Sequence, residues 1–235
     1  MNKVHRSILE DLEAVRENLL SMSDDIWLSI DHNNTDEMKR GCEFKATYND
    51  KMVAFDTLAT DISEIVQKFT QINLESNEQG GAESESENER IIRELDKSTP
   101  YGICDDFTFR RPHGFILKET AITGVVTWKR FYTRFCEALH RLDRDRFIQL
   151  PQNPEHISSH GNPEFSLDKS HLRDPILIGD SIYAEGNRSA NTFRDSIKGL
   201  LETFQIPMAD LKIYLREDRD AERVRERAIE SSASH

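Results

Sequence analysis

A run without large apolar side chains divides this sequence into two parts. Residues 75–89 contain only Glu, Ser, Asn, Gln, Gly and Ala. Such a composition provides nothing to offset the conformational entropy that a chain loses on ordering. We therefore expect a disordered acidic linker over residues 74–90, with a separately folded module on either side of it.

The charge of the chain is distributed unevenly between these modules. Residues 1–99 carry 11 basic and 22 acidic side chains, whereas residues 100–216 carry 16 basic and 15 acidic ones. The net charge of −12 is therefore concentrated in residues 1–99, which comprise the front module, the linker and the start of the rear module. This difference indicates that the two modules have different surroundings.

The front module, residues 1–73, is predicted to be a pair of long helices. Apolar residues alternate at spacings of four and three over residues 8–26 and again over residues 48–69, which is a heptad pattern. Turn-forming residues 31–37 lie between the two segments, and Thr35 is the expected N-cap of the second helix. A short polar loop between two helices favours an antiparallel hairpin, here of the coiled-coil type.

We expect this hairpin to associate, either with itself or with the helices of a partner protein. Leu58, Ile65 and Ile72 widen the apolar stripe of the second helix beyond what one neighbouring helix needs. The alternative is that the hairpin docks on the rear module of its own chain. The residues predicted to form the association seam are Leu12, Val15, Leu19, Met52, Phe55, Ile62, Val66 and Phe69.

The rear module, residues 91–216, is organised around a predicted helix over residues 127–142. Its apolar residues follow the spacing of a half-buried helix, with Thr127 as the N-cap: Trp128, Phe131, Tyr132, Phe135, Leu139 and Leu142. A second amphipathic helix is expected after Ser189. Strands are expected over residues 107–112, 114–118, 121–126, 176–178, 181–183 and 211–215. Two helices against a small, mostly antiparallel sheet make an α+β domain.

A basic face on the first of these helices is the candidate contact surface of the rear module. Acidic neighbours such as Glu137 and Asp143 dilute the positive charge, so docking of a protein is favoured and binding of nucleic acid is the alternative. The residues predicted to make these contacts are Lys129, Arg130, Arg134, Arg141, Arg188 and Arg194.

Three segments of the rear module carry a resemblance. Residues 128–131, 182–191 and 211–216 are similar to a small C-terminal domain of unknown function that recurs in bacterial proteins of defence systems and mobile elements. The resemblance covers roughly half of the chain and brings no catalytic residues with it. It implies an accessory or recognition domain in a prokaryotic protein.

No arrangement in the sequence predicts catalysis, a metal or a cofactor. His156 and His160 are four residues apart, but prolines and a glycine around them argue against a shared helical face. Cys136 and His140 lie one helical turn apart without a recognisable third group, and a buried structural thiol is the favoured interpretation. We therefore expect a protein that is not an enzyme.

The remaining features indicate the compartment and complete the functional prediction. Three widely separated cysteines do not form a disulfide framework, and no apolar run is long enough for a signal peptide or a membrane span. A cytoplasmic protein with a charged, frayed tail over residues 217–235 is expected. The predicted function is that of an assembly or adaptor subunit, which associates through its hairpin and recognises a second partner through its α+β domain.

Overall fold

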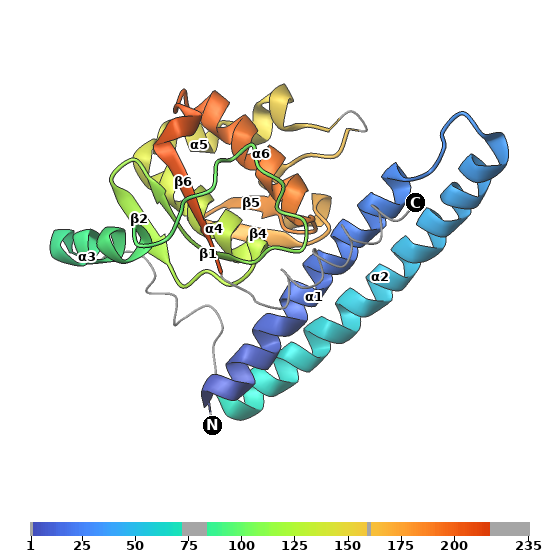
Figure 1. The fold of residues 1–235 in the computed structure, drawn as a ribbon, viewed down its shortest axis with the longest axis horizontal. Coiled ribbons are helices and arrows are strands. Elements are labelled where there is room, and N and C mark those ends of the chain that lie inside the picture. Colours follow the sequence, from blue (N-terminus) through green and yellow to red (C-terminus); the bar gives the residue numbers. More distant parts are fainter. Residues whose placement is uncertain (1, 72–83, 159–160, 217–235) are drawn as a thin grey trace. The chain divides into compact units, whose positions relative to one another are not determined.

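The computed structural model describes residues 2–71, 84–158 and 161–216, and the chain forms two compact units, residues 1–78 and 79–235. The first unit is a helical hairpin and the second an α+β domain (Figure 1). The predicted α+β class with an N-terminal antiparallel hairpin is confirmed. Most of the predicted linker and the whole predicted tail lie outside the described residues.

The hairpin consists of α1 (Asn2–Leu28) and α2 (Thr35–Thr70), which run side by side in opposite directions (Figure 1). The N-cap of α2 is Asn34, whose side chain accepts hydrogen bonds from the backbone N–H groups of Asp36 and Glu37. The prediction of Thr35 as the cap was wrong by one residue, because the Asn34 carboxamide reaches the same orphan donors. Thr35 is instead the first residue of the helix.

Polar contacts connect α1 to α2. The Arg16 guanidinium donates to the Asp56 carboxylate over 2.6 Å, and Lys45 Nζ donates to Ser23 Oγ over 2.8 Å. The pairing of Arg16 with Asp56 sets the register, because it places the first half of α1 beside the second half of α2. The large apolar residues that the hairpin buries are few, Leu9 and Met52 being 4% and 7% exposed.

The α+β domain begins with α3 (Glu85–Leu95), which starts inside the predicted linker. Ser84 caps this helix, and its acidic first turn suits the positive end of the helix dipole, so the acidic composition favours a helix start there. Ile91 and Leu95 pack against Ile116 and Tyr214 of the domain. The expectation that residues 91–95 dock on the rear domain is confirmed, whereas residues 85–90, predicted to be part of the linker, belong to α3.

Two three-stranded antiparallel sheets replace the single predicted sheet. The first has the order β2-β1-β6 and comprises β1 (Pro112–Leu117), β2 (Thr120–Thr123) and β6 (Leu211–Leu215). The second has the order β3-β5-β4 and comprises β3 (Phe165–Ser166), β4 (Pro175–Ile178) and β5 (Ile182–Glu185). The two predicted strand pairs are present, but they belong to different sheets.

The segment expected as a strand over residues 107–112 is irregular, and only Pro112 belongs to β1. Side chains rather than a neighbouring strand bind its backbone here: Asn191 Oδ1 accepts from Phe107 N over 3.0 Å, and Asp106 Oδ1 accepts from Thr108 N over 3.0 Å. The strand prediction was wrong because these side chains, one of them 84 residues away along the chain, satisfy the backbone donors that a sheet would use. The Phe107 ring is fully buried against Trp128.

The helix α4 (Trp128–Leu142) lies at the centre of the domain core, as predicted. Thr127 caps it, and its aromatic rings contact β1 through the pair Phe115 and Phe131, whose centroids are 4.7 Å apart. It also packs against β4, the short helix α5 (Arg144–Ile148) and α6 (Ala190–Thr203), which Ser189 caps as predicted. Leu142, expected in the core, is 51% exposed at the end of the helix.

Four short 3-10 helices complete the described part of the domain: η1 (Leu150–Gln152), η2 (Pro154–His156), η3 (Lys169–His171) and η4 (Met208–Asp210). Side chains of Asn153 and Asp168 cap η2 and η3. Both caps bind backbone N–H groups in the stretch between α5 and β4.

Candidate functional site

An exposed apolar face is the main candidate site of the hairpin. On α2, Phe69 is 89% exposed and Ile65 68% exposed, although both are large apolar side chains. We define the apolar face by all such residues on one side of the two helices: Val4, Ile8, Val15, Met22 and Ile26 of α1, and Leu58, Ile62, Ile65 and Phe69 of α2.

Both stripes lie on the same side of the hairpin. On α1, Val15 directly precedes Arg16, which contacts α2, so Val15 is rotated back from the contact by about 100°. On α2, Ile62 follows the buried Met52 by ten residues, which is about 80° less than three full helical turns. Ile62 is therefore rotated back from the buried side of α2, as Val15 is on α1. Because the helices are antiparallel, equal senses of rotation place both stripes on one side.

The apolar face is densest toward the open end of the hairpin. The register set by Arg16 and Asp56 places Ile8 near the level of Ile62. Monomeric proteins rarely expose a contiguous apolar patch of more than a few hundred Å². Contact with another apolar surface is therefore the function that the chemistry of this face supports.

The predicted association seam falls partly on this face. Val15, Ile62 and Phe69 are exposed members of it, whereas Met52 is buried within the hairpin. Half-buried positions are occupied by Leu12, Leu19, Phe55 and Val66. The heptad pattern predicted over residues 8–26 also contains Ile8 and Met22, which lie seven residues on either side of Val15 and are likewise exposed members of the apolar face.

The predicted basic face of α4 is largely engaged within the domain. Lys129 Nζ contacts both oxygens of Asp174 at 2.8 Å, and Arg134 contacts Glu137 at 2.9 Å. Arg130 is only 8% exposed. Arg141 is an exposed residue near the end of the helix. These four residues therefore do not present a continuous basic surface.

The other two predicted contact residues lie at the start of α6 and are also paired. Arg194 contacts Asp195 at 2.9 Å and donates to the carbonyl of Asp105. Arg188 lies 3.4 Å from Glu164 and hydrogen bonds to the hydroxyl of Ser196. Arg188 thus belongs to the domain interior rather than to a surface patch.

A buried polar cluster surrounds Glu164 in the domain. Its carboxylate accepts from Tyr132 Oη over 3.0 Å and lies 2.8 Å from His156 Nδ1. Burial raises the pKa of Glu164, but the hydrogen bond from His156 and the charge of Arg188 outweigh burial and hold that pKa below its usual value. Glu164 is therefore an anion at neutral pH.

The same surroundings act in the opposite direction on two neighbouring groups. Burial, followed by the negative charge of Glu164, raises the pKa of the Tyr132 hydroxyl and the pKa of the Cys136 thiol well above their usual values. Both groups are protonated at neutral pH. The interpretation of Cys136 as a buried thiol is supported by its complete burial.

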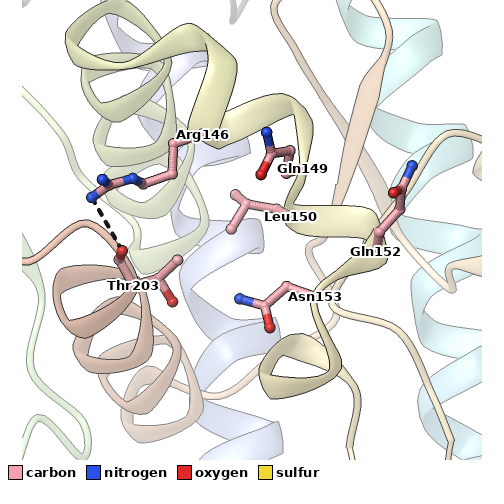
Figure 2. A pocket seen from close by; sticks show the side chains of 6 residues that line it. All are labelled: Arg146, Gln149, Leu150, Gln152, Asn153 and Thr203. Carbon is pink, nitrogen blue, oxygen red and sulfur yellow. Dashed lines mark hydrogen bonds between the residues drawn. The ribbon is translucent and has the colours of Figure 1, made fainter.

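A small pocket opens beside this cluster, and Figure 2 shows the side chains that line it. Its volume is about 260 Å³. The lining combines three carboxamides, a guanidinium, a hydroxyl and one apolar side chain: Gln149, Gln152, Asn153, Arg146, Thr203 and Leu150. Sequence reasoning did not identify this pocket, because its residues come from α5, η1, the start of η2 and the end of α6.

The histidines do not form a metal site among the described residues, where no group of three or more potential ligands converges. His156 binds Glu164 and Thr203, and His140 packs against the Phe147 ring. His160 lies outside the described residues.

Within the described residues, no helix is both long and apolar enough to cross a membrane.

Comparisons with known proteins found no match for this chain among family models, curated proteins or solved structures.

Proposed function

We propose that this protein is an assembly or adaptor subunit whose hairpin pairs with the hairpin of a second copy through the apolar face. The observation that carries the proposal is the exposure of large apolar residues at heptad spacing on both helices. Two such hairpins, face to face, form a four-helix bundle that covers both stripes.

The size of the apolar face fits an interface between two copies. Its nine exposed side chains together expose on the order of the ~800 Å² per partner that a standard interface buries. A twofold dimer uses the same patch on both subunits, so the face needs to match only itself. At the open end of the hairpin, α1 and α2 both contribute exposed apolar side chains, so the face of one copy can pack against the identical face of another.

The rest of the proposal rests on the sequence. Recognition of a second partner by the α+β domain, a place in a bacterial defence system and a cytoplasmic setting follow from the resemblance of residues 128–131, 182–191 and 211–216 and from the composition. The engaged side chains of α4 do not favour nucleic acid as that partner. Tethering a recognition domain to a dimer raises the effective concentration of the second domain at its target.

The double variant Ile62→Glu/Ile65→Glu tests the association. Light scattering on the full chain is expected to give twice the monomer mass of 27.2 kDa for the wild type at high micromolar concentration. The variant buries two carboxylates of each subunit in the twofold dimer and is expected to weaken it by at least about 100-fold, because each unpaired charge at an apolar interface costs several kcal/mol.

The matched control is Val53→Glu/Thr57→Glu, which adds the same charges to the other side of α2. Val53 is 67% exposed and follows Met52 by one residue, so it is rotated away from the apolar face. This variant is expected to dimerise like the wild type. A wild type that stays at 27.2 kDa throughout would reject the second copy as the occupant.

A further inference from the structure

A chain of hydrogen bonds links a buried carboxylate to a hydroxyl at the pocket. Glu164 Oε2 lies 2.8 Å from His156 Nδ1, and His156 Nε2 lies 2.9 Å from Thr203 Oγ1. Glu164 directly precedes β3, His156 is the last residue of η2, and Thr203 is the last residue of α6. His156 and Glu164 are 4% and 8% exposed.

The carboxylate at the buried end of these hydrogen bonds determines which atoms donate and which accept. Glu164 is ionised and carries no proton, since Tyr132 donates to its Oε1 over 3.0 Å and Arg188 lies 3.4 Å away. A carboxylate only accepts hydrogen bonds, so His156 Nδ1 must donate to it. In the neutral imidazole, Nε2 is then the acceptor, and the Thr203 hydroxyl donates its proton to it.

The pocket brings further groups to the same hydroxyl. Arg146 Nη1 donates to the carbonyl oxygen of Thr203 over 3.3 Å, which holds a positive charge beside the hydroxyl (Figure 2). Asn153 Oδ1 accepts from Glu155 N over 3.0 Å, so the NH₂ group of Asn153 is left to face the pocket. A volume of about 260 Å³ admits only a small ligand.

We propose that Thr203, His156 and Glu164 form a hydroxyl–imidazole–carboxylate triad that transfers a small acyl group from an ester to water. The arrangement of a nucleophile, a base and an orienting carboxylate is the one that activates a hydroxyl. Glu164 is a positioning residue, because it acts through His156. This activity goes beyond the association of the hairpin and does not depend on it.

The reaction balances without a further reagent. Thr203 Oγ forms a bond to the ester carbonyl carbon as its proton moves to His156 Nε2, and the carbonyl electron pair moves onto oxygen, facing the NH₂ of Asn153. The intermediate collapses, the alkoxide leaves, and it takes the proton from His156. Water then attacks the acyl-threonine with His156 again as base, and releases the acid and the Thr203 hydroxyl.

The hydrolysis of p-nitrophenyl acetate by the full-length protein tests this proposal. Thr203→Val is expected to lower the rate at least 10-fold, because valine keeps the shape and removes the nucleophile. Thr203→Ser is expected to retain or raise the rate, since a primary hydroxyl is less hindered. Reaction with diisopropyl fluorophosphate, followed by peptide mass spectrometry, is expected to place the label on Thr203.

Two further variants separate chemistry from structure. Thr133→Val removes a hydroxyl that donates only to the Lys129 carbonyl on α4, and the rate is expected to stay at the wild-type level. Glu164→Gln is expected to lower kcat while KM is retained, because it leaves His156 without its orienting anion. Equal rates for wild type and Thr203→Val, or a label that maps to another residue, would overturn the triad.

Discussion

The hairpin and the α+β domain use their apolar residues in opposite ways. In the domain, rings such as Phe135 and Phe193 are fully buried and contact other rings from both helices and sheets. In the hairpin, Leu9 and Met52 are buried, while nine large apolar side chains of the apolar face are exposed. The domain buries its apolar residues in its own core, whereas the hairpin leaves many of its large apolar residues exposed.

This difference assigns the two units different sources of stability. Burying a Phe or Ile side chain contributes roughly 1.5–3 kcal/mol, so the aromatic core stabilises the domain within a single chain. The hairpin connects its helices through ion pairs such as that of Arg16 and Asp56, whose side chains are 10% and 28% exposed. Partly exposed pairs contribute about 1 kcal/mol or less, so the hairpin gains most from covering its apolar face.

Truncating one phenylalanine in each unit gives the largest expected contrast. Phe135→Ala removes a ring that is 0% exposed, and it is expected to lower the unfolding free energy of the domain by ~3–5 kcal/mol. Phe69→Ala removes a ring that is 89% exposed, and it is expected to leave domain stability unchanged while weakening the dimer.

The two tryptophans allow each unit to be followed separately during denaturation. Trp27 lies in the hairpin and Trp128 in the domain core, so a Trp27→Phe background reports the domain alone. Urea titrations then give the free energy of each variant. A loss of domain stability in Phe69→Ala as large as that in Phe135→Ala would remove the proposed distinction between the units.

Local sequence patterns were sufficient to predict most helices and the strand pairs. Thr127 and Ser189 cap α4 and α6 as expected, because an N-cap is decided by the few residues around it. Heptad spacing likewise predicted both hairpin helices. It did not determine which residues face inward. The apolar series 8, 15 and 22 and the neighbouring series 9, 16 and 23 have the same heptad spacing, and it is Arg16 of the second series that contacts α2.

Features that depend on distant parts of the chain could not be predicted. Two sheets form instead of one because β1 pairs with β6, across almost the whole domain. The bond between His156 and Thr203 joins residues 47 positions apart, so no motif of fixed spacing describes it. Arg188, predicted to contact a partner, is directed inward by Glu164, a pairing that charge counting cannot detect.

The second contrast is between the buried carboxylate of Glu164 and the exposed carboxylate of Glu155. Because the pKa of Glu164 is depressed in the folded domain, this group stabilises the domain at pH values above its unfolded pKa of about 4.5, and the contribution is lost as pH falls through the folded pKa. Each unit of depression corresponds to about 1.4 kcal/mol. Domain stability is therefore expected to fall in acid more steeply for the wild type than for Glu164→Gln.

Urea denaturation of the domain between pH 7 and pH 3 measures this slope. Glu155→Gln, which changes an exposed carboxylate two residues after the capping Asn153, is the control and is expected to keep the wild-type slope. Titration of the Glu164 carboxyl by NMR is expected to give a pKa below 4.5. Identical slopes for wild type and Glu164→Gln would show that this carboxylate does not couple domain stability to pH.

The smallest expected effect is the gain in stability from placing glycine at a left-handed backbone position, and it is expected to be the same in both units. Gln71, the C-cap of α2, and Lys118, in the turn between β1 and β2, have φ values of 57° and 53°, in the left-handed region that disfavours residues with a Cβ. Gln71→Gly and Lys118→Gly are each expected to stabilise their own unit by about 0.5–1 kcal/mol, the relief of left-handed strain being partly offset by the greater freedom of glycine when unfolded. The same urea titrations resolve this change. Equal gains would show that backbone geometry acts locally in both units, so that their difference lies in side-chain burial; a gain in the domain alone would mean that the end of α2 is held by something other than its own backbone conformation.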